Sequence, residues 1–241
     1  MVNGLCLDFD GTLGRFQGDF AGIIEELRHE LGLLHCDFET FAHRLAVALQ
    51  SDGHLDTEIA LRRVLEDLEV RPPVDLPQIA EYAAQQYAKD VTPLTGALEL
   101  LEYTRGQNIP VALVSNGPVD MQRGAVERLG VEGYFSAILI SGDRDVAARK
   151  PAPRIFGLAC TALRSLPEET LMVGDSLEND VRGARGYGLQ TVLVRARGGD
   201  EQRSADAEES GMRVADEAFS AAAESVAVVA HVGELVGSWL R

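Results

Sequence analysis

Cysteine is scarce in this sequence of 241 residues: Cys6, Cys36 and Cys160 lie far apart and form no CxxC pair. This spacing gives no disulfide pairing pattern, and it predicts reduced thiols in a cytoplasmic protein. No apolar run approaches the roughly 18 residues that a membrane-spanning helix needs. The N-terminal residues carry no basic segment ahead of the first apolar run, so we expect no secretory signal.

Basic residues are also outnumbered, since 22 Lys and Arg face 38 Asp and Glu, for a formal net charge of −16. This excess argues against non-specific binding of nucleic acid. It does not exclude an anionic substrate, because a bound cation can dominate the local field. The composition, 46% hydrophobic and 25% charged, is that of a globular protein long enough to bury a sizeable core.

The segment LCLDFDGTL (5–13) combines a short apolar run with two acidic residues and a glycine turn. It predicts a buried strand, on which side chains two residues apart share a face, so we expect Asp8 and Asp10 to lie together. Adjacent carboxylates at a buried strand end are costly unless a hard cation lies between them or one is protonated. Both conditions are typical of phosphoryl-transfer sites, although Asp-Gly is also ordinary turn chemistry.

Residues 15–90 show apolar residues at helical spacing and no clear strand. Asp56 is a candidate N-cap, and Pro72 and Pro73 end the helix that follows it. The pattern predicts an all-helical insert with helices at 18–33, 38–50, 56–70 and 75–89.

From Val91 onward helices and strands alternate, which predicts an α/β fold with a doubly wound, Rossmann-like parallel sheet covered on both faces. Strands are predicted at 109–114, 137–141, 170–174 and 190–195. Helices are predicted at 94–107, 118–129, 150–164 and 178–187. Ligands of such sheets bind at the carboxyl ends of the strands, where the polar residues of this chain fall.

The last part of the chain departs from this alternation. Residues 196–224 are small and acidic, which predicts a loop or a weak helix over 205–223. A short strand at 226–230 and a closing helix that carries Trp239 are expected after it.

Four motifs, each at a predicted strand end or helix start, give the chain a resemblance to the phosphohydrolases of the haloacid dehalogenase (HAD) superfamily. They are DFDGT (8–12), VSNG (114–117), RKPAPRIF (149–156) and VGDSLENDV (173–181), in the order of the family. The resemblance implies that Asp8 is a nucleophile that forms an aspartyl-phosphate. It implies that Asp10 protonates the leaving alcohol and then activates water.

The family pattern also implies a Mg²⁺ site. Asp8, Asp175 and the backbone carbonyl of Asp10 would be the direct ligands, and Asp180 would bind directly or through water. An acid in the first turn of a helix, such as Asp180, is also favourable for the helix alone.

The phosphoryl group needs donors and a positive charge, since negative charge spreads over its three oxygens. The resemblance assigns the Ser115 hydroxyl as donor and Lys150 as cation. It assigns the Asn116 backbone N–H as a further donor, and the Gly11 and Thr12 N–H groups are candidates to complete the phosphate cradle. Arg15, at the expected seam between cap and core, is a candidate contact for a second anionic group, with a surface salt bridge as the equal alternative.

The helical insert falls where many members of the superfamily carry a cap over the site. This predicts a HAD-like core of residues 1–14 and 91–241 and a cap of residues 15–90, with hinges near Gly14 and 91–93. The expected function is that of a cytoplasmic, magnesium-dependent phosphatase for a small phosphorylated metabolite, such as a phosphoglycolate-type compound or a sugar or nucleotide monophosphate. The oligomeric state, monomer or homodimer, stays open.

Other members of the same fold class are alternatives. A haloacid dehalogenase resembles the chain except at the second acidic position of the first motif, so Asp10 favours a phosphatase. A phosphomutase of the beta-phosphoglucomutase type and an inactive scaffold share the motifs and stay open. A signalling receiver domain is much shorter, lacks a helical insert, and carries its phosphoacceptor Asp at the end of a later strand.

Overall fold

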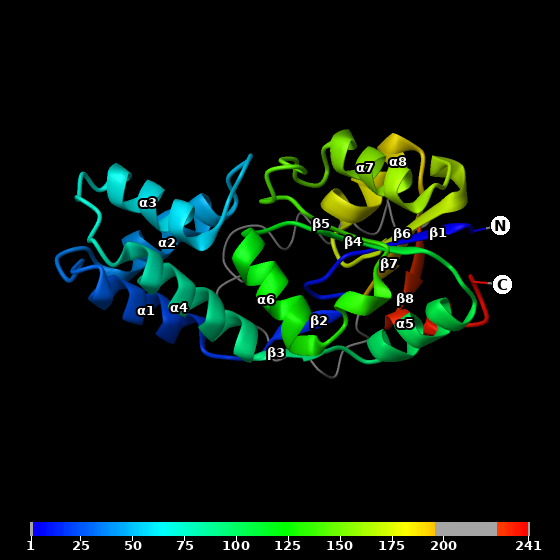
Figure 1. The fold of residues 1–241 in the computed structure, drawn as a ribbon, viewed down its shortest axis with the longest axis horizontal. Helices are drawn as coiled ribbons and strands as arrows, with labels where there is room; N and C mark the ends of the chain where they lie inside the picture. The colour runs from blue at the N-terminus through cyan, green and yellow to red at the C-terminus, as the bar shows by residue number, and fades with distance from the viewer. Residues whose placement is uncertain (1, 196–225, 241) are drawn as a thin grey trace.

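The computed structural model describes residues 2–195 and 226–240. Its main sheet has six parallel strands in the order β5-β4-β1-β6-β7-β8, so the chain crosses over on both sides of β1 (Figure 1). This confirms the predicted α/β, doubly wound fold. The strands are β1 (Gly4–Leu7), β4 (Val111–Ser115), β5 (Ala137–Ile140), β6 (Thr170–Gly174), β7 (Gln190–Val194) and β8 (Ala227–Val229).

Helices cover both faces of this sheet: α5 (Ala97–Gly106) and α6 (Val119–Leu129) lie on one, and α7 (Pro153–Leu163) and α8 (Gly183–Tyr187) lie on the other. Alternate residues of each strand serve the two layers. Leu5 and Leu7 of β1 pack in the core beneath α5 and α6, whereas Cys6 packs in the core beneath α7 and α8. The strands are therefore apolar on both faces, and polar residues begin where they end.

Four helices form a second hydrophobic core beside the sheet, at the left of Figure 1, and we call them the four-helix group. They are α1 (Phe20–Glu30), α2 (Phe38–Leu49), α3 (Thr57–Asp67) and α4 (Leu76–Lys89). The side chains of Asp19, Asp37 and Asp56 accept hydrogen bonds from backbone N–H groups in the first turns of α1, α2 and α3. The N-cap predicted at Asp56 is thus confirmed.

The two connections between this group and the sheet pair with each other. β2 (Gly14–Phe16) and β3 (Val91–Pro93) form an antiparallel ribbon in which Arg15 lies opposite Thr92. The prediction of helix alone over 15–90 is wrong at its first two residues. Strands of three residues are too short to show the alternation that identifies a strand in a sequence.

Three helix predictions also need correction. The helix expected from Lys150 starts at Pro153, because the preceding turn places the Ala152 N–H on the Arg149 carbonyl. The helix expected at 178–187 is a π-helix, Leu177–Arg182, that continues into α8. The closing helix is one 3-10 turn, Val232–Leu235, and a left-handed glycine follows at Gly237. The weak helix predicted at 205–223 lies outside the described residues.

The loop between α2 and α3 rests on loops that follow two strands of the sheet. The Leu55 N–H donates to the Gly142 carbonyl at 2.9 Å, and the Leu55 carbonyl accepts from the Val119 N–H at 2.9 Å. The Thr57 N–H donates to both carboxylate oxygens of Asp120 at 3.1 Å. A Cβ at Gly142 would overlap the Leu55 carbonyl oxygen, so this close approach requires glycine. These bonds hold the four-helix group against the edge of the sheet where strands β4 and β5 end.

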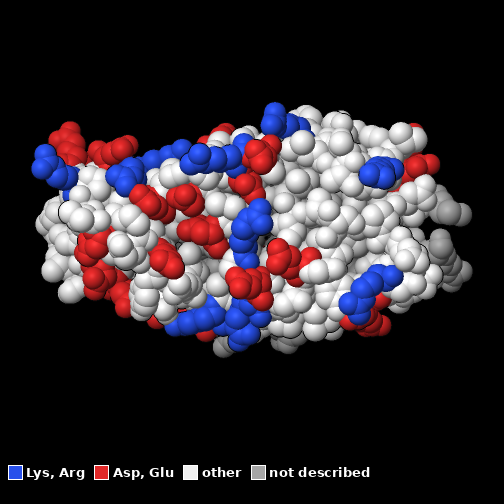
Figure 2. All heavy atoms as spheres, viewed as in Figure 1, with Lys and Arg blue, Asp and Glu red and all other residues white. Residues whose placement is uncertain are grey.

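Charged side chains are unevenly spread over the face seen in Figure 2. Acidic and basic groups are interspersed over the four-helix group and along the middle of the molecule, and the sheet half at the right is mostly uncharged on this face. Mixed charge of this kind is typical of a solvated surface. Within residues 2–195 and 226–240, none of the helices has the length and apolarity required to cross a bilayer.

Candidate active site

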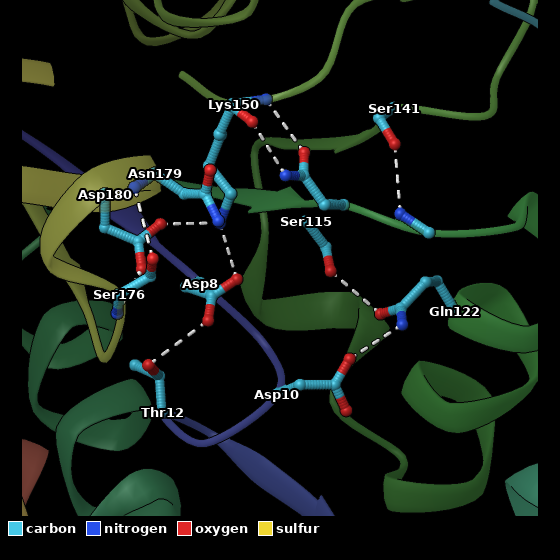
Figure 3. Close-up of polar contacts among 12 residues, drawn as sticks. Asp8, Asp10, Thr12, Ser115, Gln122, Ser141, Lys150, Ser176, Asn179 and Asp180 are labelled. Carbon is cyan, nitrogen blue, oxygen red and sulfur yellow. Dashed lines mark hydrogen bonds and ion pairs between the residues drawn. The ribbon is translucent and has the colours of Figure 1, made fainter. Parts of the chain in front are cut away.

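A buried ion-pair group lies at the carboxyl ends of β1 and β6 (Figure 3). Asp8 directly follows β1, and the Nζ atom of Lys150 lies 2.6 Å from Asp8 Oδ1 and 2.7 Å from Asp180 Oδ1. Asp8, Lys150 and Asp180 are 6%, 4% and 1% exposed. Burial raises the pKa of Asp8 to about 7, although the Lys150 ammonium opposes the rise. Residues from three separate motifs therefore meet in one electrostatic unit.

The backbone of Lys150 is held by the side chain of Asn116. Asn116 Nδ2 donates to the Lys150 carbonyl at 2.9 Å, and the Lys150 N–H donates to Asn116 Oδ1 at 2.8 Å. Burial opposes the charge on Lys150, but the Asp8 and Asp180 carboxylates prevail and raise its pKa. The ammonium of Lys150 is thus charged, and the backbone from which its side chain extends is held in place by Asn116.

Asp180 is placed by the turn that follows β6. Its Oδ2 accepts from the Ser176 N–H at 2.9 Å, and Ser176 Oγ accepts from the Asn179 N–H at 3.1 Å, so the helix start is capped. A Cβ at Gly174 would overlap the Asp180 carboxylate. The glycine that ends β6 thus makes room for this carboxylate.

Asp8, Asp175 and Asp180 offer carboxylate oxygens that all lie within 4.8 Å of one another. Asp175 stays open to solvent, and partial desolvation together with Asp180 raises its pKa to about 6. Three carboxylates and the one ammonium of Lys150 leave a formal charge of −2 when all are ionised, which a divalent cation balances. All three donors are the hard oxygens that such cations prefer, so the residues fit a divalent metal. The Asp10 carboxylate lies outside this group, and the predicted contribution of its backbone carbonyl stays a prediction.

Asp10 lies in different surroundings, among neutral donors. Its Oδ1 accepts from the Tyr87 hydroxyl at 2.7 Å, and its Oδ2 accepts from Gln122 Nε2 at 2.8 Å. Gln122 Oε1 in turn accepts from Ser115 Oγ at 2.9 Å. Figure 3 shows the Asp10 carboxylate directed toward Gln122 and away from Asp8. The expected shared face is not found, because β1 ends at Leu7 and its pleat does not reach Asp10.

Tyr87 reaches this carboxylate from the last turns of α4, in the four-helix group. Its ring stacks on Phe16 of β2, with centroids 5.2 Å apart and planes 9° apart. Burial and the neighbouring Asp10 carboxylate raise the pKa of Tyr87, so its hydroxyl keeps the proton that it donates.

The turn after β1 holds two of the predicted substrate residues, Gly11 and Thr12. The Gly11 N–H donates to the Gly14 carbonyl and the Thr12 N–H to the Phe9 carbonyl, so both groups are engaged within the turn. Thr12 instead contacts the site through its hydroxyl, 3.4 Å from Asp8 Oδ2. Gly11 has a φ of +76°, and a Cβ there would overlap Asp175 Oδ2. The need for glycine is structural, and the substrate contacts of Gly11 and Thr12 stay predictions.

The other predicted substrate residues differ in burial. Ser115 is buried at the end of β4, next to the turn in which the Gly117 N–H donates to Ser141 Oγ at 3.0 Å. Arg15 is exposed on β2. Their contacts with a substrate, and that of the Asn116 N–H, stay predictions.

Sequence reasoning missed two polar residues of this site, Tyr87 and Gln122, and it gave no role to Ser176, which lies in the fourth motif. Ser176 carried a signal, since a serine three residues before Asn179 at a predicted helix start fits an N-cap. Tyr87 and Gln122 lie inside amphipathic helices, where nothing in the spacing distinguishes them from ordinary packing residues.

Comparison with known proteins gives consistent matches. A family model for haloacid dehalogenase-like hydrolases matches residues 2–188. The ribulose-1,5-bisphosphate 5-phosphatase of Halopiger xanaduensis is 30% identical over 230 residues, 90% of this chain and 92% of that protein. A phosphoserine phosphatase of Thermus thermophilus is 43% identical over 94 residues, 39% of this chain and 37% of its own length. The crystal structure of CbbY from Rhodobacter sphaeroides in complex with phosphate shares the fold, with a TM-score of 0.64 at 19% identity over 99% of this chain and 98% of that one.

Proposed function

The chain belongs to the haloacid dehalogenase-like hydrolases, and from that premise we propose that it is a phosphatase of small phosphorylated metabolites that works through an aspartyl-phosphate on Asp8. The observation that carries the proposal is the contact of Lys150 with both Asp8 and Asp180 beside the open carboxylate of Asp175. Phosphoryl transfer of this kind needs a carboxylate nucleophile, a fixed positive charge such as the Lys150 ammonium, and acidic residues that bind a metal ion.

In the first half-reaction, a carboxylate oxygen of Asp8 attacks the phosphorus, and the bond from phosphorus to the leaving oxygen breaks. Lys150, 2.6 Å from Asp8, holds the attacking carboxylate in place and faces the transferring group with positive charge. Asp10 gives its proton to the departing oxygen, so the alcohol leaves neutral. Ser115 is the proposed hydroxyl donor to a phosphoryl oxygen; its single O–H donates to Gln122 Oε1 in this structure, so it turns from that acceptor when the phosphoryl group is bound.

In the second half-reaction, water attacks the phosphorus of the aspartyl-phosphate. Asp10, now a carboxylate, takes the proton from this water, and the bond between phosphorus and Asp8 breaks. Phosphate leaves, and both aspartates return to their starting states.

We assign the metal site to Asp8, Asp175 and Asp180, and to the backbone carbonyl of Asp10. Mg²⁺ is the proposed ion, because it prefers oxygen ligands and binds through few carboxylates beside substrate phosphate. When bound, it supplies charge neutralisation for the phosphoryl oxygens and for the acidic set. Three carboxylates within 4.8 Å of one another support this assignment.

The four-helix group is proposed to be a cap, with residues 15–90 as one domain and residues 1–14 and 91–241 as the core. Its separate hydrophobic core and the β2–β3 ribbon at the junction support the division. A cap in this position excludes water from the site and contacts the leaving group. Arg15, on that ribbon, is the proposed contact for a second anionic group of the substrate.

The names of relatives, which include a ribulose-1,5-bisphosphate 5-phosphatase and a phosphoserine phosphatase, support the proposed substrate class. A small phosphomonoester, one of the phosphoglycolate, sugar or nucleotide type, is the expected class for this chain. A cytoplasmic location is proposed along with it.

Phosphate release from a panel of phosphorylated metabolites tests this function. The panel is run with Mg²⁺ and again with an excess of chelator, and Asp8→Asn protein is the matched control. The expected result is release from a small subset of compounds that stops with chelator and with the variant. Interconversion of sugar-phosphate isomers without release would assign a mutase instead, and no reaction with any compound would contradict an enzymatic function.

A further inference from the structure

Asp10 is contacted by two residues to which the mechanism above gives no task. The Tyr87 hydroxyl donates to Oδ1 at 2.7 Å, and Gln122 Nε2 donates to Oδ2 at 2.8 Å. Tyr87 belongs to α4 and Gln122 to α6, and both are buried, at 8% and 4% exposed. Two neutral donors from two different helices thus converge on one carboxyl group.

Donors on both oxygens remove the main freedom of an aspartate side chain. The terminal torsion of Asp is broad, so an unheld carboxyl group turns easily about its last bond. One donor per oxygen fixes the plane of the group, and each oxygen keeps a further lone-pair site for a transferred proton. The contacts therefore orient Asp10 without blocking proton transfer.

We propose that Gln122 and Tyr87 are positioning residues that hold the carboxyl group of Asp10 in the orientation from which it protonates the leaving group. The inference rests on the proposed phosphatase function. It adds two residues outside the four motifs to the machinery of the reaction.

The Gln122 side chain is itself held in one direction. Its Oε1 accepts from Ser115 Oγ at 2.9 Å, so the amide turns its NH₂ group toward Asp10. Figure 3 shows this continuous path from Ser115 through Gln122 to Asp10. With no phosphoryl group bound, Ser115 and the proposed acid Asp10 are thereby joined through one amide.

The Tyr87 contact has a second consequence, because Tyr87 and Asp10 lie on opposite sides of the junction between the four-helix group and the sheet. Tyr87 is a residue of α4, and its ring stacks on Phe16 of β2. The position of its hydroxyl therefore depends on the position of the four-helix group. Asp10 is therefore fully held only while the four-helix group is docked.

The variants Tyr87→Phe and Gln122→Met test the proposal, because each removes a donor and keeps most of the side-chain volume. The value of kcat/KM is measured for an alkyl phosphate substrate and for p-nitrophenyl phosphate. The alkoxide of the first needs a proton in order to leave, whereas p-nitrophenolate leaves without one. We expect kcat/KM to fall by about 10-fold or more for the alkyl phosphate and by less than about 3-fold for p-nitrophenyl phosphate.

Tyr82→Phe is the matched control. Tyr82 lies on the same helix, but it is 41% exposed and its hydroxyl donates to Glu26. This variant is expected to leave both values unchanged. An equal loss for both substrates in Tyr87→Phe and Gln122→Met would show a merely structural role and overturn the proposal, and so would the absence of any loss.

The failure of this inference is distinguishable from failure of the proposed function. If the unaltered protein releases phosphate from none of the panel compounds, p-nitrophenyl phosphate included, the function itself is wrong. If it hydrolyses both the alkyl phosphate and p-nitrophenyl phosphate, and the variants show no dependence on the leaving group, the phosphatase function stands and only the positioning role falls.

Discussion

The two sides of the site are built on different physical principles. On the charged side, Asp8 and Asp180 are buried against the Lys150 ammonium. Burial makes each of these charges costly to desolvate, so each depends on its oppositely charged partner for compensation. On the neutral side, Asp10 is held by the hydroxyl of Tyr87 and the amide of Gln122. Charge thus holds the proposed nucleophile, Asp8, whereas neutral hydrogen-bond donors hold the proposed acid, Asp10.

The largest effect is expected from the nucleophile on the charged side. Asp8→Asn keeps the shape of the side chain but cannot form the aspartyl-phosphate, so turnover should fall by about 10⁴-fold or more. Steady-state phosphate release measures the loss, and circular dichroism checks that the fold is intact. A variant with undiminished turnover would remove Asp8 from the mechanism.

On the neutral side, Asp10→Asn removes the acid and base but no charge pair. Turnover should fall by about 10³-fold, with dephosphorylation affected more than phosphorylation when the leaving group is p-nitrophenolate. Rapid-quench kinetics separates the two steps. Normal turnover in this variant would show that another group moves the proton.

Lys150→Met tests the charged side in a second way, because it leaves the buried carboxylates without their cation. We expect a loss of activity of about 10²-fold to 10³-fold. We also expect a loss of about 3 kcal/mol in the free energy of unfolding in chelator, since an unpaired buried charge is costly. Denaturant unfolding with and without Mg²⁺ measures it. Unchanged stability in chelator would mean that the pairing contributes little.

The charged side also predicts a pH dependence. The pKa of Asp8 is raised from 3.8 to about 7 and that of Asp175 from 3.8 to about 6, so the folded chain binds more protons than the unfolded chain between these values. Without metal, stability should therefore be greatest below about pH 4 for these groups and be lost as the pH rises to 7. A divalent cation needs the ionised carboxylates, so it should raise Tm more at pH 8 than at pH 5, by about 5 °C at saturation. Equal shifts at both pH values would argue against this metal site.

The smallest effect is expected at Arg15, which is exposed on β2. Arg15→Ala should raise KM by less than about 3-fold for a substrate with one anionic group, because an exposed charge pair contributes about 1 kcal/mol or less. For a substrate with a second anionic group the rise should be larger. KM values for a matched pair of such substrates provide the test, and equal changes would exclude the contact.

The same division explains what the sequence could predict. The strands and the placement of Asp8, Ser115 and Asp175 at their carboxyl ends follow from apolar runs that stop at polar residues, and the sheet confirms that reasoning. The positions of Asp8 and Asp175 are therefore predictable from the pattern, because parallel strand ends meet at one edge of a sheet. Lys150 and Asp180, which lie at no strand end, were assigned only through the resemblance to the HAD superfamily.

The contacts of the neutral side could not be predicted from the sequence pattern. Tyr87 meets Asp10 only because α4 packs across α6, and neither helix carries a periodic signal for a polar contact. The direction of the Asp10 side chain was also not predicted. It depends on where β1 ends and on the turn that is closed by hydrogen bonds to the Phe9 carbonyl. Such features depend on tertiary packing between residues far apart in the chain.

The most direct test of the account is to look for the phosphoryl group on the protein itself. Asp10→Asn protein is mixed with p-nitrophenyl phosphate, quenched in acid and digested, and the peptides are analysed by mass spectrometry. The account predicts a phosphoryl group on Asp8 that accumulates in this variant and is absent from Asp8→Asn protein treated in the same way. Release of p-nitrophenol with no phosphorylated peptide, or with the phosphoryl group on another residue, would contradict it.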